Sequence, residues 1–107
     1  MHVMIGTTTG NASEAELIAS ACVEAGLCAC AHIDEIKSFF RWDGEVQNET
    51  EFRVFLKTVE GRYAEIEALV RRMHSYDEPA VFCIPITHGS ATYLDWMVKH
   101  SGGHIEI

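Results

Sequence analysis

The chain has 107 residues, which suits one domain with a single hydrophobic core. Hydrophobic residues make up 48% of it, which excludes a disordered chain, and the net charge of −8 disfavours nucleic acid because phosphates repel an acidic protein. No stretch approaches the ~18–20 apolar residues that span a bilayer, so we expect no membrane partner. We expect a cytoplasmic protein, and in that reducing compartment its four cysteines would be thiols.

The first two expected elements are a strand and a helix. Residues 3–6 form a short, mainly apolar run that is typical of a β-strand, and a polar loop follows this run. Ser13 and Glu16 have the spacing of a capping box, which predicts a helix with Ser13 as its N-cap. Gly26 is typical of the residue that ends such a helix.

From residue 27 the hydrophobic period changes to two, which predicts a long β-hairpin. Its strands cover residues 27–42 and 45–58, and Asp43-Gly44 between them is a strong two-residue turn signal. The alternation places Cys28, Cys30 and His32 on one face of the first strand.

The rest of the chain predicts helices over residues 60–74 and 90–100, whose apolar residues, Tyr93 among them, recur at helical spacing and are expected to face inward. Between them, residues 80–84 form a continuous apolar run, which is typical of a central strand covered on both faces. Residues 104–107 alternate like a short edge strand. The order βαββαβ with a C-terminal helix predicts an α+β ferredoxin-like sandwich, formed as one domain by residues 1–107.

The hairpin carries more apolar surface than two helices can cover. Its aromatic residues are Phe39, Phe40, Trp42, Phe52 and Phe55. An exposed patch of that size is a liability in a monomer, so the sequence predicts self-association through the sheet.

No catalytic or nucleotide-binding motif occurs, so we expect no enzyme and no organic cofactor. The remaining candidates are metal ligands. Cys30 and His32 offer soft sulfur and imidazole, which suit copper or zinc, although packing is the more frequent role of a free cysteine. Lys57 lies among apolar residues, where a lysine extends to solvent, pairs with an acid or anchors an anion.

Three other features have both a structural and a functional interpretation. His74 ends the second helix, where a histidine either complements the helix dipole or binds a ligand. Glu45, Glu49 and Glu51 occupy odd positions of one expected strand and could line one face, where their carboxylates could hold a hard cation, but a solvated row is the commoner case. Trp42 is more often a packing residue than a ligand platform.

Four motifs, in order and in register across about residues 2–97, resemble the CutA divalent-cation tolerance family. They are Cys30 followed by Ser38-x-Phe40-x-Trp42-x-Gly44, Glu51 followed by Leu56-Lys57-Thr58, His74-x-Tyr76-x-x-Pro79, and Pro85-x-x-x-Gly89-x-x-x-Tyr93-Leu94-x-Trp96. The chain departs from the family in having Ser75 where proline is common and Ala80 where glutamate is common. Some members also have, in place of Gly6, a cysteine that has been proposed to bind copper.

The resemblance implies a ferredoxin-like homotrimer assembled through the long hairpins, with a role in tolerance of divalent cations, copper above all. It also implies a cleft between protomers. By motif, Cys30 and His74 would be the metal ligands of that cleft, and Trp42, Lys57 and Tyr76 would line it. Copper or another divalent cation is then the expected ligand, and the expected partners are two further copies of the chain and metal ions.

Two other functions stay open at this point. One is a small-molecule sensor that binds an anionic effector in the cleft, a hypothesis that rests on fold analogy and on Lys57. The other is a non-catalytic scaffold that engages other proteins, for which the sequence marks no docking surface.

Overall fold

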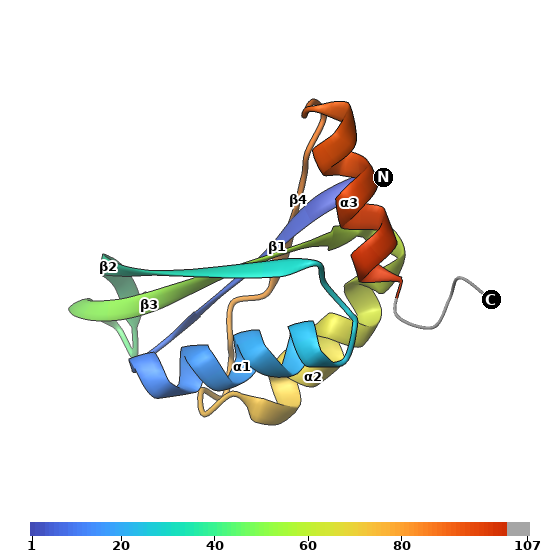
Figure 1. Cartoon of the computed structure of the whole chain (residues 1–107). Coiled ribbons are helices and arrows are strands. Elements are labelled where there is room, and N and C mark those ends of the chain that lie inside the picture. The colour runs from blue at the N-terminus through green and yellow to red at the C-terminus, as the bar shows by residue number, and fades with distance from the viewer. Residues whose placement is uncertain (103–107) are drawn as a thin grey trace.

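The computed structural model describes residues 1–102 and shows a four-stranded antiparallel sheet with three α-helices (Figure 1). The strands lie in the order β2-β3-β1-β4, which together with the element order confirms the predicted ferredoxin-like arrangement. Along the chain the elements are β1 (His2–Thr9), α1 (Ala12–Glu24), β2 (Cys30–Trp42), β3 (Glu45–Val59), the short 3-10 helix η1 (Glu60–Arg62), α2 (Tyr63–Met73), β4 (Phe82–Pro85) and α3 (Ala91–Ser101).

Helices α1 and α2 cover one face of the sheet, and α3 lies against the other face near the N-terminal end of β1 (Figure 1). Alternate residues of the central strands face α1 and α2, so Ile5 of β1 and Leu56 of β3 are opposite each other and fully buried. Ile18 of α1 and Ile66 of α2 complete this core from the helical side. The sheet face that these helices leave open therefore carries the other half of each strand's side chains.

The start of α1 differs from the predicted capping box. Asn11 is the N-cap, and its side-chain oxygen accepts a hydrogen bond from the Glu14 amide at 2.8 Å. Ser13 lies inside the helix and donates its hydroxyl to the same oxygen at 2.8 Å. Asparagine and serine are both good N-caps, so the helix begins at the earlier of the two.

The β2–β3 hairpin extends well beyond the rest of the sheet. Strand β1 pairs with β3 only from Phe52 to Val59, so residues 36–51 form a free two-stranded arm, which we call the hairpin arm. Phe39, Trp42 and Val46 on this arm are 69%, 57% and 63% exposed. An isolated two-stranded hairpin is marginally stable in water, and apart from Glu51 near its base the arm is largely uncovered by the rest of residues 1–102.

The prediction of a buried central strand over residues 80–84 was wrong. Strand β4 spans Phe82–Pro85, lies at the edge of the sheet, and is exposed along its whole length. A continuous apolar run is typical of any strand that is covered on both faces, and the sequence does not show whether another part of the same chain supplies that cover. The strand expected over residues 104–107 lies outside the described residues.

Candidate functional site

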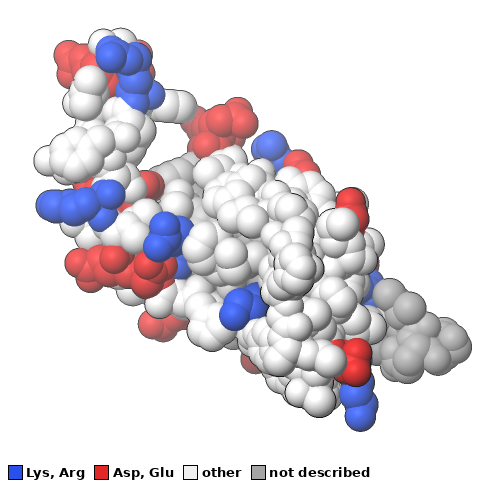
Figure 2. Space-filling model, turned by 90° about the horizontal axis from the view of Figure 1, so that it is seen from above, with Lys and Arg blue, Asp and Glu red and all other residues white. Residues whose placement is uncertain are grey.

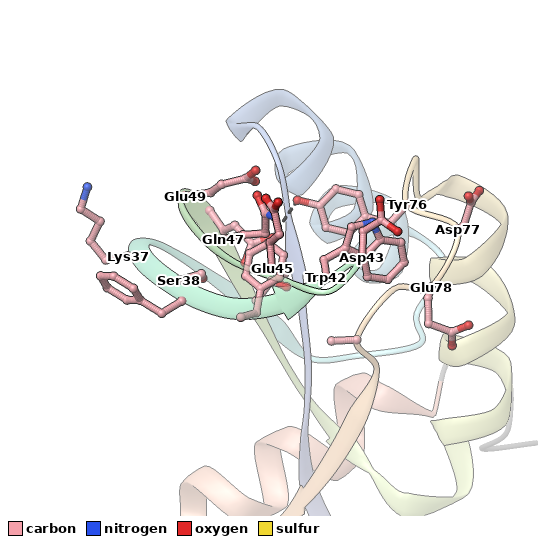
Figure 3. A pocket seen from close by; sticks show the side chains of 15 residues that line it. Lys37, Ser38, Trp42, Asp43, Glu45, Gln47, Glu49, Tyr76, Asp77 and Glu78 are labelled. Carbon is pink, nitrogen blue, oxygen red and sulfur yellow. Dashed lines mark hydrogen bonds between the residues drawn. The ribbon is translucent and has the colours of Figure 1, made fainter.

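An open groove of about 870 Å³ lies between the hairpin arm and the segment that follows α2 (Figure 3). Its lining includes six carboxylates and one lysine, which are Asp43, Glu45, Glu49, Glu51, Asp77, Glu78 and Lys37. Three of the glutamates, Glu45, Glu49 and Glu51, come from one side of β3, as their odd-numbered positions in the sequence predicted. The excess of carboxylates makes this groove, called the acidic groove below, a place that attracts cations.

Tyr76 joins the two walls of the acidic groove. Its hydroxyl donates a hydrogen bond to Glu51 Oε2 at 2.7 Å (Figure 3). Glu51 is only 6% exposed, so the expected solvated carboxylate is in fact a buried and hydrogen-bonded one. Burial and then the bond to Glu51 raise the pKa of the Tyr76 phenol above its usual value, so the phenol stays protonated and keeps donating.

His74 holds the same segment from the other side. Its side chain is fully buried, and the Tyr76 amide donates to Nδ1 at 3.1 Å, so Nδ1 is the acceptor nitrogen. Nε2 therefore carries the proton and donates it to the Thr8 carbonyl at 2.7 Å. Both ring nitrogens are engaged, so a metal ion could reach Nδ1 only by displacing the Tyr76 amide.

The loop after His74 is also tied to α1. The Glu14 carboxylate accepts hydrogen bonds from the Ser75 amide and the Ser75 hydroxyl, both at 2.9 Å. Glu14 Oε2 lies 3.3 Å from His74 Nδ1 as well, but an amide can only donate, so the Tyr76 amide decides the state of that nitrogen. Residues 74–76 are thereby pinned to β1, α1 and β3.

Cys30 and Lys57 are brought together at the opposite end of the sheet. They face each other across β2 and β3 in the strand register, and Met4 of β1 continues the same row. Tyr93 of α3 lies over them, with its hydroxyl 3.7 Å from Cys30 Sγ and its ring centroid 5.5 Å from Lys57 Nζ.

The predicted site residues thus divide into two groups within a protomer. Trp42 and Tyr76 line the acidic groove, with His74 behind them, whereas Cys30 and Lys57 lie in the row of Met4. His74 binds the carbonyl of Thr8, four residues along β1 from Met4, and that separation is about 13 Å at 3.3 Å per strand residue. Within residues 1–102 no three His, Cys, Asp or Glu side chains are grouped so as to hold a metal ion. The donor set of one protomer therefore does not fit a metal centre that combines Cys30 with His74.

The other cysteines do not join Cys30. Cys28 precedes β2 and is buried in the core, with 1% of its surface exposed. The prediction that Cys28 shares a strand face with Cys30 and His32 was therefore wrong. Burial raises the pKa of the Cys28 thiol to about 12 and that of Cys22 to about 11, so both stay protonated. These two cysteines are packing residues, whereas Cys83 on the edge strand is exposed.

Comparison with known proteins shows which family the chain matches. A family model described as CutA1 divalent ion tolerance protein matches residues 3–100. The chain belongs to that family. The divalent-cation tolerance protein CutA of Archaeoglobus fulgidus is 42% identical over 97 residues, which are 91% of this chain and 95% of that protein, and its structure is similar with a TM-score of 0.88.

Two further CutA proteins extend the comparison. The protein of Thermus thermophilus is 32% identical, with 95% of this chain and 100% of that chain covered, and gives a TM-score of 0.91. The protein of a Shewanella species is 36% identical, with 94% of each chain covered, and gives a TM-score of 0.89. The Archaeoglobus protein is described as periplasmic. No helix within residues 1–102 of our chain is long and apolar enough to cross a membrane.

The departure from the CutA pattern at Gly6 has a structural reason. A Cβ atom at this position would lie 2.5 Å from Phe82 Cζ and 2.9 Å from Phe55 Cε1. The two phenylalanine rings meet edge to face over the glycine, with centroids 6.4 Å apart. Aromatic side chains therefore occupy the space that a cysteine side chain would need.

Two residues of these sites could not be anticipated from local sequence patterns. Glu14 contacts a loop 61 positions later in the chain, and no local pattern signals such a tertiary contact. Tyr93 has helical spacing that suggested an inward-facing core residue, whereas it is 36% exposed and covers Cys30 and Lys57. The signal for Tyr93 was its place in the fourth CutA motif rather than its periodicity.

Proposed function

We propose that the chain acts as a homotrimeric, non-enzymatic divalent-cation tolerance protein that attracts cations, copper foremost, to the acidic groove. The observation that carries this proposal is the six carboxylates against one lysine around a groove of about 870 Å³ in a CutA family member. For a given set of oxygen, nitrogen or sulfur ligands, Cu²⁺ binds more tightly than the other first-row divalent ions. Copper is therefore the first cation to test.

The trimer part of the proposal rests on surface that one protomer leaves uncovered. Within residues 1–102 no third strand pairs with the hairpin arm, and its exposed side chains include Phe39 and Trp42. On the open sheet face, residues other than Lys, Arg, Asp and Glu cover most of the middle of the molecule, with some basic side chains among them, while many charged side chains gather toward the hairpin end (Figure 2). Edge strand β4 adds Phe82 and Ile84, which are 40% and 38% exposed. Repeated copies would bury these surfaces in a closed ring.

The role of Cys30 and His74 as ligands stays a prediction within this proposal. The Cys30 thiol is partly exposed and is a soft donor suited to Cu⁺. Ligation by His74 requires loss of the hydrogen bond from the Tyr76 amide. We also propose a reducing, cytoplasmic location because all four cysteines are free thiols, and cell fractionation tests it.

The test is a Cu²⁺ titration against a competing chromophoric chelator. The double variant Glu45→Gln/Glu49→Gln removes two charges from the acidic groove, and Glu16→Gln/Glu24→Gln removes two exposed charges from α1 as the matched control. Two unit charges 4 Å apart attract by about 1 kcal/mol even in water, and here two carboxylates are lost to a divalent cation, so we expect affinity to fall at least about tenfold in the first variant and little in the second. Equal affinities in the two variants would sink the cation role of the groove. Mass in solution by light scattering tests the trimer separately, and a monomer would overturn that part.

A further inference from the structure

Lys57 occupies an unusual place for a lysine. It lies on β3 between the buried Leu56 and Thr58, so its side chain projects from the open sheet face, the one that α1 and α2 do not cover. It is partly buried there, under α3. Its ammonium group lies 5.5 Å from the centroid of the Tyr93 ring, which is within the range of a cation–π contact.

No acidic group of the described chain compensates this charge. Among residues 1–102 the ion pairs within 4.0 Å are those of Arg53, Arg62, Arg71 and His74, and none of them involves Lys57. The chain has 16 acidic residues, so this is not a shortage of partners. A partly buried ammonium that is paired only with an aromatic ring still has the capacity to bind an anion.

Beside this ammonium is an aromatic surface. Tyr93 stacks on Trp96 with centroids 5.8 Å apart and an interplanar angle of 20°, and Trp96 in turn contacts His100 at 5.3 Å. Tyr93 and Trp96 are 36% and 40% exposed, which is high for such large side chains. Exposed aromatic rings next to a cation are the means by which proteins hold flat anionic ligands, since stacking and charge act together.

We propose that Lys57, Tyr93 and Trp96 form a binding site for a small organic anion that carries a planar ring. The anionic group, a carboxylate or a phosphate, pairs with the Lys57 ammonium, and the ring lies against the Tyr93–Trp96 stack. This site is separate from the acidic groove, since Lys57 lies in the row of Met4 and the groove reaches β1 at Thr8, about 13 Å away. It binds the opposite charge and does not depend on the cation role of the acidic groove, although Cys30, the predicted thiol ligand, adjoins the anion site.

Tryptophan fluorescence gives a direct test in the full chain at its natural association state. The protein has two tryptophans, so the Trp42→Phe background leaves Trp96 as the sole reporter, and light scattering first checks that this variant keeps the mass of the parent protein. Benzoate and phenyl phosphate are the probes, cyclohexanecarboxylate is the control without a flat ring, and benzyl alcohol is the control without charge. We expect saturable quenching by one or both of the first two and a weaker response to the controls.

Variants assign the response to residues. Lys57→Met keeps an unbranched side chain, shorter by one atom, and removes the charge, and we expect it to weaken binding about tenfold or more, while Lys99→Met on the exposed side of α3 leaves binding unchanged. Trp96→Leu, followed by calorimetry with Trp42 intact, should abolish the preference for benzoate over cyclohexanecarboxylate. The proposal is overturned if neither probe gives a saturable change, if Lys57→Met binds as well as the parent, or if a control compound binds equally. If Lys57→Met does not fold, the Trp96→Leu result and the two control compounds still decide the matter.

Discussion

The buried His74 provides the sharpest test of how the groove wall is held. The change His74→Ala removes the hydrogen bond to the Thr8 carbonyl and the one from the Tyr76 amide, at 2.7 and 3.1 Å. It also leaves a cavity, because the side chain is 0% exposed. Each of the two hydrogen bonds contributes about 1 kcal/mol, and the cavity costs about 1 kcal/mol more. We therefore expect the free energy of unfolding to fall by about 3 kcal/mol.

The assay is chemical denaturation followed by circular dichroism, with all proteins at one concentration because association shifts apparent stability. His88→Ala in the exposed loop before α3 is the matched control, and surface changes of that kind stay within about 0.5 kcal/mol. If His74→Ala were no more destabilising than His88→Ala, the His74 ring would not be a structural anchor of the groove wall. In that case its nitrogens would be available to a ligand, and the metal role of His74 would gain support.

Two other substitutions examine contacts on either side of this anchor. Tyr76→Phe removes the bond to the buried Glu51 carboxylate, so we expect a loss of about 1–3 kcal/mol in denaturation experiments, and an unchanged midpoint would contradict it. Because the pKa of Tyr76 is raised in the folded state, its contribution is fully present below the unfolded pKa of about 10 and is lost only as pH rises above it, which an alkaline stability series checks. Gly6→Ala forces Phe82 to move and should lower the melting temperature by the equivalent of about 1–3 kcal/mol. The control is Gly61→Ala, where an added Cβ has nothing within 4 Å, and equal melting temperatures for the two variants would refute the packing argument.

The sequence was sufficient for the order and type of the elements because those depend on local patterns. The period of two after residue 27 and the Asp43-Gly44 turn correctly indicated a long hairpin with β2 ending at Trp42 and β3 beginning at Glu45. Cys28 was assigned to the strand because alternation continued back through it, whereas the chain leaves α1 and enters the core there before β2 begins at Cys30. Periodicity does not distinguish a strand from an extended residue that precedes it.

The candidate site was less predictable because its contacts join distant parts of the chain. Spacing correctly placed Glu45 and Glu49 on one side of β3, but it did not show that Tyr76 would cover Glu51. His74 was ambiguous in the sequence because a helix end suits both a dipole contact and a ligand. Only the three-dimensional positions of Thr8 and the Tyr76 amide show that both of its nitrogens are engaged.

Strand register explains why the predicted ligands cannot meet within one protomer. Bringing Cys30 to the row of Thr8 would require β2 and β3 to slide by four residues along β1, and any slip by an odd number would turn the core side chains outward. Even slips preserve the faces, but each of them would end the edge-to-face contact that Phe55 and Phe82 make over Gly6. A slip by two would set Met4 or Thr8 opposite Phe55, and the slip by four that Cys30 needs would carry Phe55 away from Phe82, which β4 holds opposite Gly6. Cys30 and His74 can therefore share an ion only across two copies of the chain, so the mass in solution bears on the metal site as directly as on the assembly.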